Sequence, residues 1–249
     1  MWARLLPGRA VGGTLLNVYS LLLALLLIYP TLQLFIVAVS DDIVFPPRYF
    51  SLEAFRELTP SFWASIPFSL ALGAATTVLL ILLCLPTAYA MERTKFRGRN
   101  LMSVAIFLPF VIPGVGYMVA LGTVYLLVFP GVMGTFIGVL VPTAIGNLAW
   151  MVRAIQGSLA TTDPVYEEAG LMLGAGRMRA FFSITLPQIA PGIVVGAMIV
   201  FANSATAFIA PLFLGGVKSI TATVEIYREL DQHGLTPRLA VQALLVELV

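Results

Sequence analysis

Charged residues, histidine and cysteine are scarce in this sequence of 249 residues. Asp, Glu, Lys and Arg together make up 10% of it, with one cysteine, Cys84, and one histidine, His233. A single cysteine excludes an intrachain disulfide, and one histidine with one cysteine cannot supply the ligand set of a zinc site. We therefore predict no bound metal and no cofactor.

Residue patterns that carry catalysis are also missing. Neither lysine, Lys95 nor Lys218, follows a glycine, so the phosphate-binding loop Gly-x4-Gly-Lys-Ser/Thr is absent. No Ser-His-Asp arrangement is visible either. We predict that the chain is not an enzyme and does not itself hydrolyse ATP.

Apolar residues, by contrast, make up 59% of the sequence, and the mean hydropathy is +0.98. A helix needs about 20 apolar residues to cross a bilayer. Five runs meet this requirement, at about residues 15–39, 66–90, 101–128, 134–157 and 191–214. A sixth run begins after Pro237 and is too short to cross alone, so either the sequence is a piece of a longer one or this helix ends inside the membrane. We predict one all-α polytopic membrane domain, residues 1–249, with five complete transmembrane helices and a partial sixth.

Basic residues are distributed unequally between the two sides of these runs. One side carries Arg4, Arg9, Arg93, Lys95, Arg97, Arg99, Arg153, Arg177 and Arg179. The other carries Arg48, Arg56, Lys218, Arg228 and Arg238. Because the richer side is cytoplasmic by the positive-inside rule, we expect a cytoplasmic N-terminus and an outer loop at about residues 40–63.

A polar segment at about residues 158–190 separates the fourth and fifth runs. Asp163 and Pro164 form a good helix start, and Glu167 and Glu168 then fall in the first turn, where carboxylates favour the helix dipole. Gly174 suits a left-handed helix end. A second short helix should follow over residues 178–184 and end near Pro187, which predicts a helix, an elbow and a helix.

The spacing in this segment follows the pattern Glu-Ala-Ala-x3-Gly-x9-Ile-x-Leu-Pro. The matching residues are Glu168, Ala169, Gly174, Ile184, Leu186 and Pro187, and Gly170 stands where the pattern has its second alanine. The segment resembles the cytoplasmic coupling loop of the membrane subunits of binding-protein-dependent, type I ABC importers. The resemblance implies a multi-pass permease subunit of the bacterial inner membrane, whose loop, Glu167 included, couples it to ATP-binding subunits. It also implies a second permease subunit and an extracytoplasmic solute-binding protein as partners.

Three polar side chains interrupt the fifth run: Asn203, Ser204 and Thr206. Since each is costly against lipid, they should face the bundle, another subunit or a water-filled translocation path. From the residues alone, hydrogen bonding between helices and contact with substrate are equally open. The stretch around Pro211 and residues 214–216, with Ile226 and Tyr227, more loosely resembles the polyamine and ferric-iron branches of the importers. Polyamine, ferric iron, organophosphonate and thiamine all remain open as substrates.

Prolines and glycines inside the runs predict bends and close helix contacts. Pro86, Pro109, Pro113 and Pro142 remove backbone donors, so kinks are expected there. Small residues such as Gly73 and Gly196 fit closely packed membrane helices.

Two other classes of protein compete with this interpretation. A secondary transporter or channel driven by an ion gradient would place acids or bases in mid-membrane, and the five runs carry none away from their ends. An intramembrane enzyme is disfavoured because catalytic pairings are missing.

Overall fold

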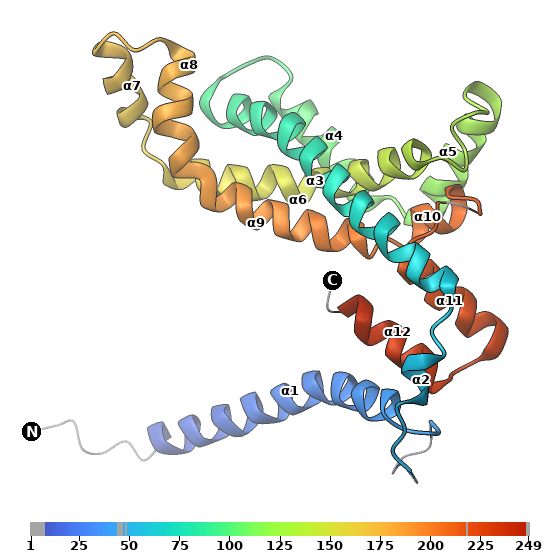
Figure 1. Cartoon of the computed structure of the whole chain (residues 1–249). Helices are drawn as coiled ribbons and strands as arrows, with labels where there is room; N and C mark the ends of the chain where they lie inside the picture. The colour runs from blue at the N-terminus through green and yellow to red at the C-terminus, as the bar shows by residue number, and fades with distance from the viewer. Residues whose placement is uncertain (1–7, 44–46, 48, 218, 248–249) are drawn as a thin grey trace, which may run out of the picture. The chain divides into compact units, whose positions relative to one another are not determined.

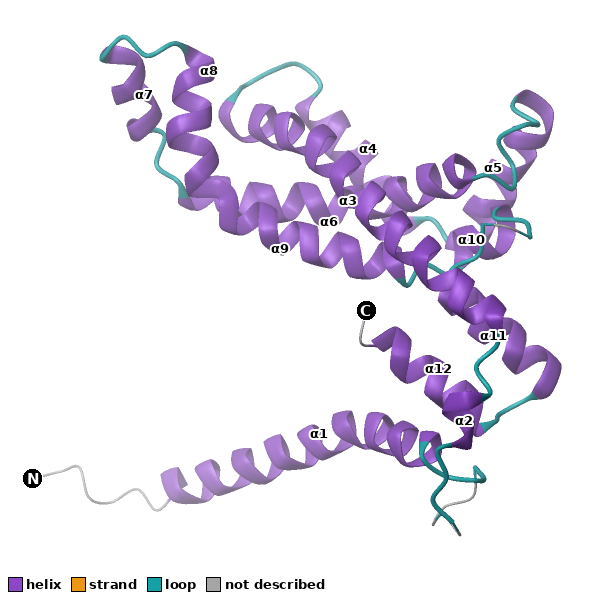
Figure 2. Cartoon of the chain, viewed as in Figure 1, coloured by secondary structure: helices purple, strands orange, loops and turns teal. Residues whose placement is uncertain are grey.

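Helices form nearly all of the regular structure in the part of the chain that the structure, a computed structural model, describes: residues 8–43, 47, 49–217 and 219–247 (Figure 1). An isolated antiparallel bridge joins Ser40 to Phe50, and no strand is drawn within these residues (Figure 2). The helices are α1 (Gly8–Ala38), α2 (Glu53–Arg56), α3 (Pro60–Arg93), α4 (Arg99–Val111), α5 (Gly114–Val128), α6 (Phe136–Thr161), α7 (Val165–Met172), α8 (Arg177–Ala180), the π-helix η1 (Phe181–Thr185), α9 (Leu186–Ala205), α10 (Ile209–Leu214), α11 (Ala222–His233) and α12 (Pro237–Glu247). Arg4, Arg48 and Lys218, which enter the charge argument above, lie outside the described residues.

Four of these helical stretches are long and apolar enough to cross a membrane: Leu16–Ala38, Pro60–Arg93, Phe136–Thr161 and Arg177–Ala205. The predicted third span is instead a pair, α4 and α5, bent by 105°, and it makes a fifth span if the pair is counted as one. The bend falls at Pro113, which lacks an N–H and holds Ile112 extended, at ψ 132°. The all-α membrane fold is confirmed. Pro86, Pro109 and Pro142 lie inside continuous helices.

The chain divides into two compact units, which we describe separately. The larger unit runs from Pro60 to Tyr227, and its centre is the packing of α3, α6 and α9 on one another (Figure 1). Their shared core includes Leu80, Met151 and Ile189, each fully buried.

Glycines allow α6 and α9 to approach closely. A Cβ atom at Gly192 would lie 2.4 Å from the Cβ of Ser158, and one at Gly196 would lie 2.9 Å from the Sδ of Met151. Because the two glycines are four residues apart, they share one face of α9, as in membrane helix pairs held by small residues.

The fifth predicted run, 191–214, was wrong at its outer end, because α9 ends at Ala205 and a separate α10 follows. Pro211 cannot donate to the carbonyl of Ala207 and would clash with it in a continuous helix. That carbonyl instead accepts a hydrogen bond from the hydroxyl of Thr221 (2.7 Å), and the Thr206 carbonyl accepts one from Thr223 (3.2 Å).

The smaller unit comprises described residues within Met1–Thr59 and Arg228–Leu248. Its core joins α1, α2 and α12 through Ala38, Ala54, Ala240 and Val241. The last helix begins at Pro237, as expected from the sequence.

Candidate functional site

The loop between α6 and α9 is built around the short helix α7, which begins where the sequence predicted. The side chain of Asp163 accepts a hydrogen bond from the N–H of Val165 at 2.9 Å, and Pro164 precedes the first turn. Glu167 and Glu168 occupy that turn, near the positive end of the helix.

Gly174 ends α7 in the left-handed conformation, with φ +88°. The N–H of Ala175 bonds to the carbonyl of Gly170 (3.1 Å), and the N–H of Gly174 bonds to that of Leu171 (3.0 Å). This pair of bonds is the Schellman motif, which satisfies carbonyls that the helix end would otherwise leave free. A residue with a Cβ is strained at this φ, so the elbow depends on glycine here.

Gly170, where the chain departs from the motif, is closely packed. Gly170 is buried, and a Cβ placed there would lie 2.6 Å from the Cδ1 of Ile184. Two motif positions, fourteen residues apart in sequence, therefore touch across the elbow and hold its two limbs together.

The second limb differs from the prediction. Residues after Gly176 do not form a short helix that ends at Pro187, because α8, η1 and α9 run on as one helical stretch, Arg177–Ala205. The π-helical turn η1 immediately precedes Leu186 and Pro187. Pro187 falls at the start of α9, where a missing N–H is tolerated, and the wider π turn takes up the change in register.

Glu167 ties the loop to the bundle. Its Oε1 accepts a hydrogen bond from the hydroxyl of Tyr89 on α3 at 2.5 Å, and its Oε2 accepts one from Thr185 on η1 at 2.6 Å. The ring of Tyr89 also packs edge-on against Phe181, with centroids 5.1 Å apart. One carboxylate thus links three elements: α3, α7 and η1.

Arg93 makes a second tie at the same end of the unit. Its Nη2 donates to the carbonyl of Thr162 at 2.7 Å, just after α6. The α3–α4 connection and the α6–α7 connection therefore lie at one end of the bundle. Tyr89 and Thr185 were not predicted from the sequence, since neither belongs to the motif, and Arg93 was predicted only as one of the basic residues on the cytoplasmic side.

Other motif side chains face outward. Glu168 and Ala169 are exposed, as is Pro187, whereas Leu186 is half-buried against the core of α3, α6 and α9. The tip of the elbow is apolar and open: Met172 and Leu173 are each 89% exposed. An exposed apolar tip on a loop anchored at its base has the form of a docking surface.

The polar cluster of the fifth run lies near the far end of α9. Asn203 and Thr206 are exposed, while Ser204 is fully buried. The Nδ2 of Asn147 on α6 donates to the hydroxyl of Ser204 (3.4 Å), and its Oδ1 accepts from the Nδ2 of Asn203 (3.3 Å). Asn147, another amide in an apolar run, was missed from sequence although the same cost against lipid could have indicated it.

A metal centre has no support in the described residues, where no group of three or more His, Cys, Asp or Glu side chains could hold an ion.

Comparison with known proteins places these features in a family. The protein-family model described as "Binding-protein-dependent transport system inner membrane component" matches residues 84–246 of this chain. The molybdenum transport system permease protein ModB of Escherichia coli (strain K12) is 32% identical over 186 residues, which cover 67% of this chain and 78% of that protein. The molybdate/tungstate permease protein WtpB of Pyrococcus abyssi is 31% identical over 171 residues, 67% of this chain and 66% of that protein.

A sulfate permease and a solved structure add to the comparison. The sulfate transport system permease protein CysT of Salmonella typhimurium is 30% identical over 139 residues, which cover 52% of this chain and 50% of that protein. A chain of a bacterial ABC transporter involved in the import of alginate matches the fold with a TM-score of 0.72 and 17% identity, over 97% of this chain and 92% of that chain. These relatives do not support the looser resemblance to the polyamine and ferric-iron branches. The chain belongs to the family of inner-membrane components of binding-protein-dependent transport systems, and it is a permease subunit of an ABC importer.

Proposed function

We propose that this permease subunit carries a tetrahedral oxyanion of the molybdate, tungstate or sulfate class across the membrane. The observation that carries the proposal is its similarity to the permease proteins ModB, WtpB and CysT, whose names give these anions. The subunit would act with a second permease subunit, ATP-binding subunits and a solute-binding protein.

The side chains near the end of α9 suit an anion better than a cation. Asn203 presents a neutral amide group, which can donate a hydrogen bond to an oxyanion without trapping it by charge, and the buried Asn147 accepts a hydrogen bond from that amide. Within the described spans the one carboxylate is Glu92, in the last turn of α3. A polyamine or ferric ion would find no acidic partner deeper in these helices.

We assign Asn203 and Thr206 to the translocation path, because both are exposed on this subunit and costly against lipid. Ser204 would support the path by holding Asn147 in place. At the opposite end, Glu168 and the exposed apolar tip of the elbow would dock on the ATP-binding subunit. This end would be cytoplasmic, and the N-terminus with it, in agreement with the excess of basic residues on that side.

Transport assays on the reconstituted complex test the substrate. The permease, its partner subunits and its binding protein, in proteoliposomes, should take up radiolabelled molybdate, tungstate or sulfate when ATP is supplied. Putrescine and ferric iron should not be taken up. ATP-dependent uptake of putrescine or iron without any oxyanion uptake would refute the substrate class and leave the permease assignment intact.

A further inference from the structure

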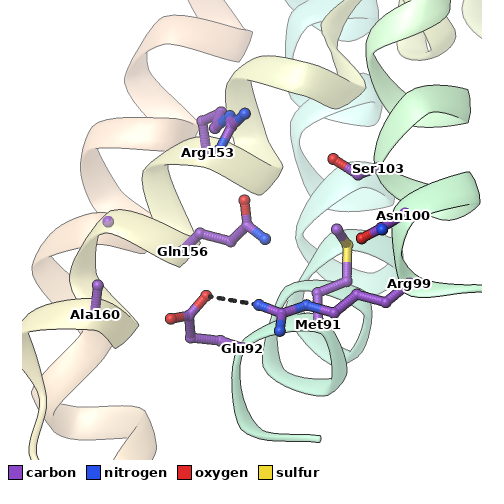
Figure 3. A pocket seen from close by; sticks show the side chains of 9 residues that line it. Met91, Glu92, Arg99, Asn100, Ser103, Arg153, Gln156 and Ala160 are labelled. Carbon is purple, nitrogen blue, oxygen red and sulfur yellow. Dashed lines mark ion pairs between the residues drawn. The ribbon is translucent and has the colours of Figure 1, made fainter. Parts of the chain in front are cut away.

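A polar cleft of about 460 Å³ lies between α3, α4 and α6, at the end of the bundle that carries the elbow (Figure 3). Its polar lining consists of Glu92, Arg99, Asn100, Ser103, Arg153 and Gln156. None of these residues belongs to the coupling motif or to the polar cluster of α9.

Cationic groups outnumber acidic ones in the cleft. Arg99 and Arg153 line the cleft with a single carboxylate, Glu92, and the distance from the Arg99 guanidinium to that carboxylate is 4.0 Å with both side chains partly exposed. Such an open ion pair is weak, so Arg99 keeps most of its capacity to bind an anion. The Arg153 guanidinium stacks over the ring of Phe107, 4.3 Å from its centroid, which holds it in place while its N–H groups stay available.

The start of α4 adds a partial positive charge to the same wall. Gly98 precedes the helix with φ +94°, no side chain caps it, and its first turn contains no acid. The N-terminus of a thirteen-residue helix without such a cap favours an anion. Asn100 and Ser103, from the first two turns, bring neutral donors into the cleft.

Gln156, on α6, is the last of the polar side chains that line the cleft. Its amide extends into the space between the helices (Figure 3). Its Oε1 is buried and accepts no hydrogen bond from any residue that the structure describes. That oxygen is an acceptor and does not itself attract an oxyanion; the donor that Gln156 offers to the cleft is its Nε2 group, across from Arg99 on α4.

The cleft lies on a different face of α6 from Asn147. Gln156 follows Asn147 by nine residues, which at about 100° per residue is about 180° around the helix, and at about 1.5 Å per residue is about 14 Å along it. A ligand in the cleft is thus separated from the Asn147–Asn203 pair both around the helix and along it.

We propose that this cleft is a second anion site, which binds a tetrahedral oxyanion at the elbow end of the permease, apart from the translocation path. The chemistry is that of a phosphate-like group held by two guanidinium groups, neutral donors and a helix N-terminus. The group can come from an anionic phospholipid headgroup or from a free oxyanion, and the geometry does not depend on which oxyanion the transporter imports.

The test uses the assembled transporter, with its partner and ATP-binding subunits, in nanodiscs. In one arm the lipid is phosphatidylcholine alone, and equilibrium binding of radiolabelled molybdate and of inorganic phosphate is measured without the binding protein. In the other arm the lipid contains one part phosphatidylglycerol to four parts phosphatidylcholine, and native mass spectrometry counts retained phosphatidylglycerol. Arg153→Gln should weaken binding about tenfold in one of the arms, as expected for loss of a charge-assisted bond, and Arg153→Lys should restore part of it.

Three controls keep the result interpretable. Arg97→Gln removes an equal charge from the α3–α4 connection, beside the cleft, but Arg97 does not line the cleft, so this variant should leave binding within about twofold. Asn203→Leu should leave anion binding in the cleft unchanged, whereas it should abolish any anion binding in the translocation path. Retention of the ATP-binding subunit shows that each variant is assembled.

Loss in the first arm identifies a free oxyanion and loss in the second a lipid headgroup, and each supports the site. Unchanged binding by Arg153→Gln in both arms, or an equal loss in Arg97→Gln, overturns it. None of these binding results depends on which substrate is taken up in the transport assay. Failure of this site and failure of the proposed substrate are therefore distinguishable.

Discussion

Replacing Glu167 by glutamine should loosen α7 from the bundle without removing the exposed docking surface. The carboxylate of Glu167 accepts hydrogen bonds from Tyr89 at 2.5 Å and from Thr185 at 2.6 Å, and these bonds join α7 to α3 and to η1. Glutamine has nearly the same shape but offers one acceptor oxygen and no charge. One of the two hydroxyls must therefore lose its acceptor, and the other keeps only a neutral one.

The magnitude follows from the kinds of bond lost. A hydrogen bond to a charged group contributes about 1.5–3 kcal/mol and one between neutral groups about 0.5–1.5 kcal/mol. The loss over the two bonds should therefore lower the free energy of opening α7 by about 2 kcal/mol, which raises the local opening equilibrium constant about 30-fold. Thr185 is buried, so water cannot readily replace its lost acceptor, whereas Tyr89 is half-buried and can recover part of the loss.

Hydrogen–deuterium exchange on the assembled transporter measures this opening directly. Amides of Val165–Met172 should exchange up to about 30-fold faster in Glu167→Gln, while the ATP-binding subunit remains bound and ATP-driven uptake falls. Glu168→Gln is the matched control, because this neighbouring carboxylate is exposed: it should leave exchange unchanged and instead weaken ATPase binding. In a Tyr89→Phe background the effect of Glu167→Gln should shrink by about 1 kcal/mol. Strict additivity of the two substitutions, or equal exchange in Glu167→Gln and the parent, would refute the role given to this carboxylate.

Three further changes test the elbow and the path. Gly170→Ala should change ATPase retention little, because the Cδ1 of Ile184, which its Cβ would meet at 2.6 Å, is the end of a side chain that can turn away; a loss of retention that Ile184→Val restores would show that Ile184 cannot move. Gly174→Val should destabilise the elbow by about 1–3 kcal/mol through its φ of +88°, seen as faster exchange over α7 and loss of the ATP-binding subunit; normal docking and uptake would count against the Schellman turn. Asn203→Leu should lower uptake while assembly and basal ATPase remain, whereas lost assembly would show that its bond to Asn147 serves packing.

Local features of the elbow could be predicted from the sequence because their causes are local. Asp163 caps the N–H two residues on, and Gly174 adopts the conformation that only glycine takes without strain, so both are visible in a short window of residues. Contacts between distant segments could not be predicted in this way. Tyr89 and Glu167 are 78 residues apart, and nothing near either residue indicates the other.

The local rules for proline gave one wrong prediction, the helix end near Pro187. Pro187 predicts a helix end, yet the helix continues through it, because the π turn η1 absorbs the missing hydrogen bond just upstream. Pro113 follows the rule, since Ile112 before it is extended and the chain bends by 105°. The difference depends on the surroundings: Thr185, in η1, is buried and hydrogen-bonded to Glu167, which stabilises the irregular turn.

The continuity of α8, η1 and α9 has a mechanical consequence for the proposed function. The second limb of the elbow and Asn203, the proposed path residue, belong to one helical stretch, and the 26 steps along the chain from Arg177 to Asn203 span about 39 Å at about 1.5 Å per residue. A movement imposed on the elbow by the ATP-binding subunit would therefore reach Asn203 along a single helix. The close approach of α9 to α6 at Gly192 and Gly196 gives that helix a fixed neighbour to pivot against, and η1 is the irregular turn between the elbow and this contact. On this argument Glu167, which holds η1 and α7 to α3, determines how much of the movement passes into α9 and how much is lost as bending at the π turn.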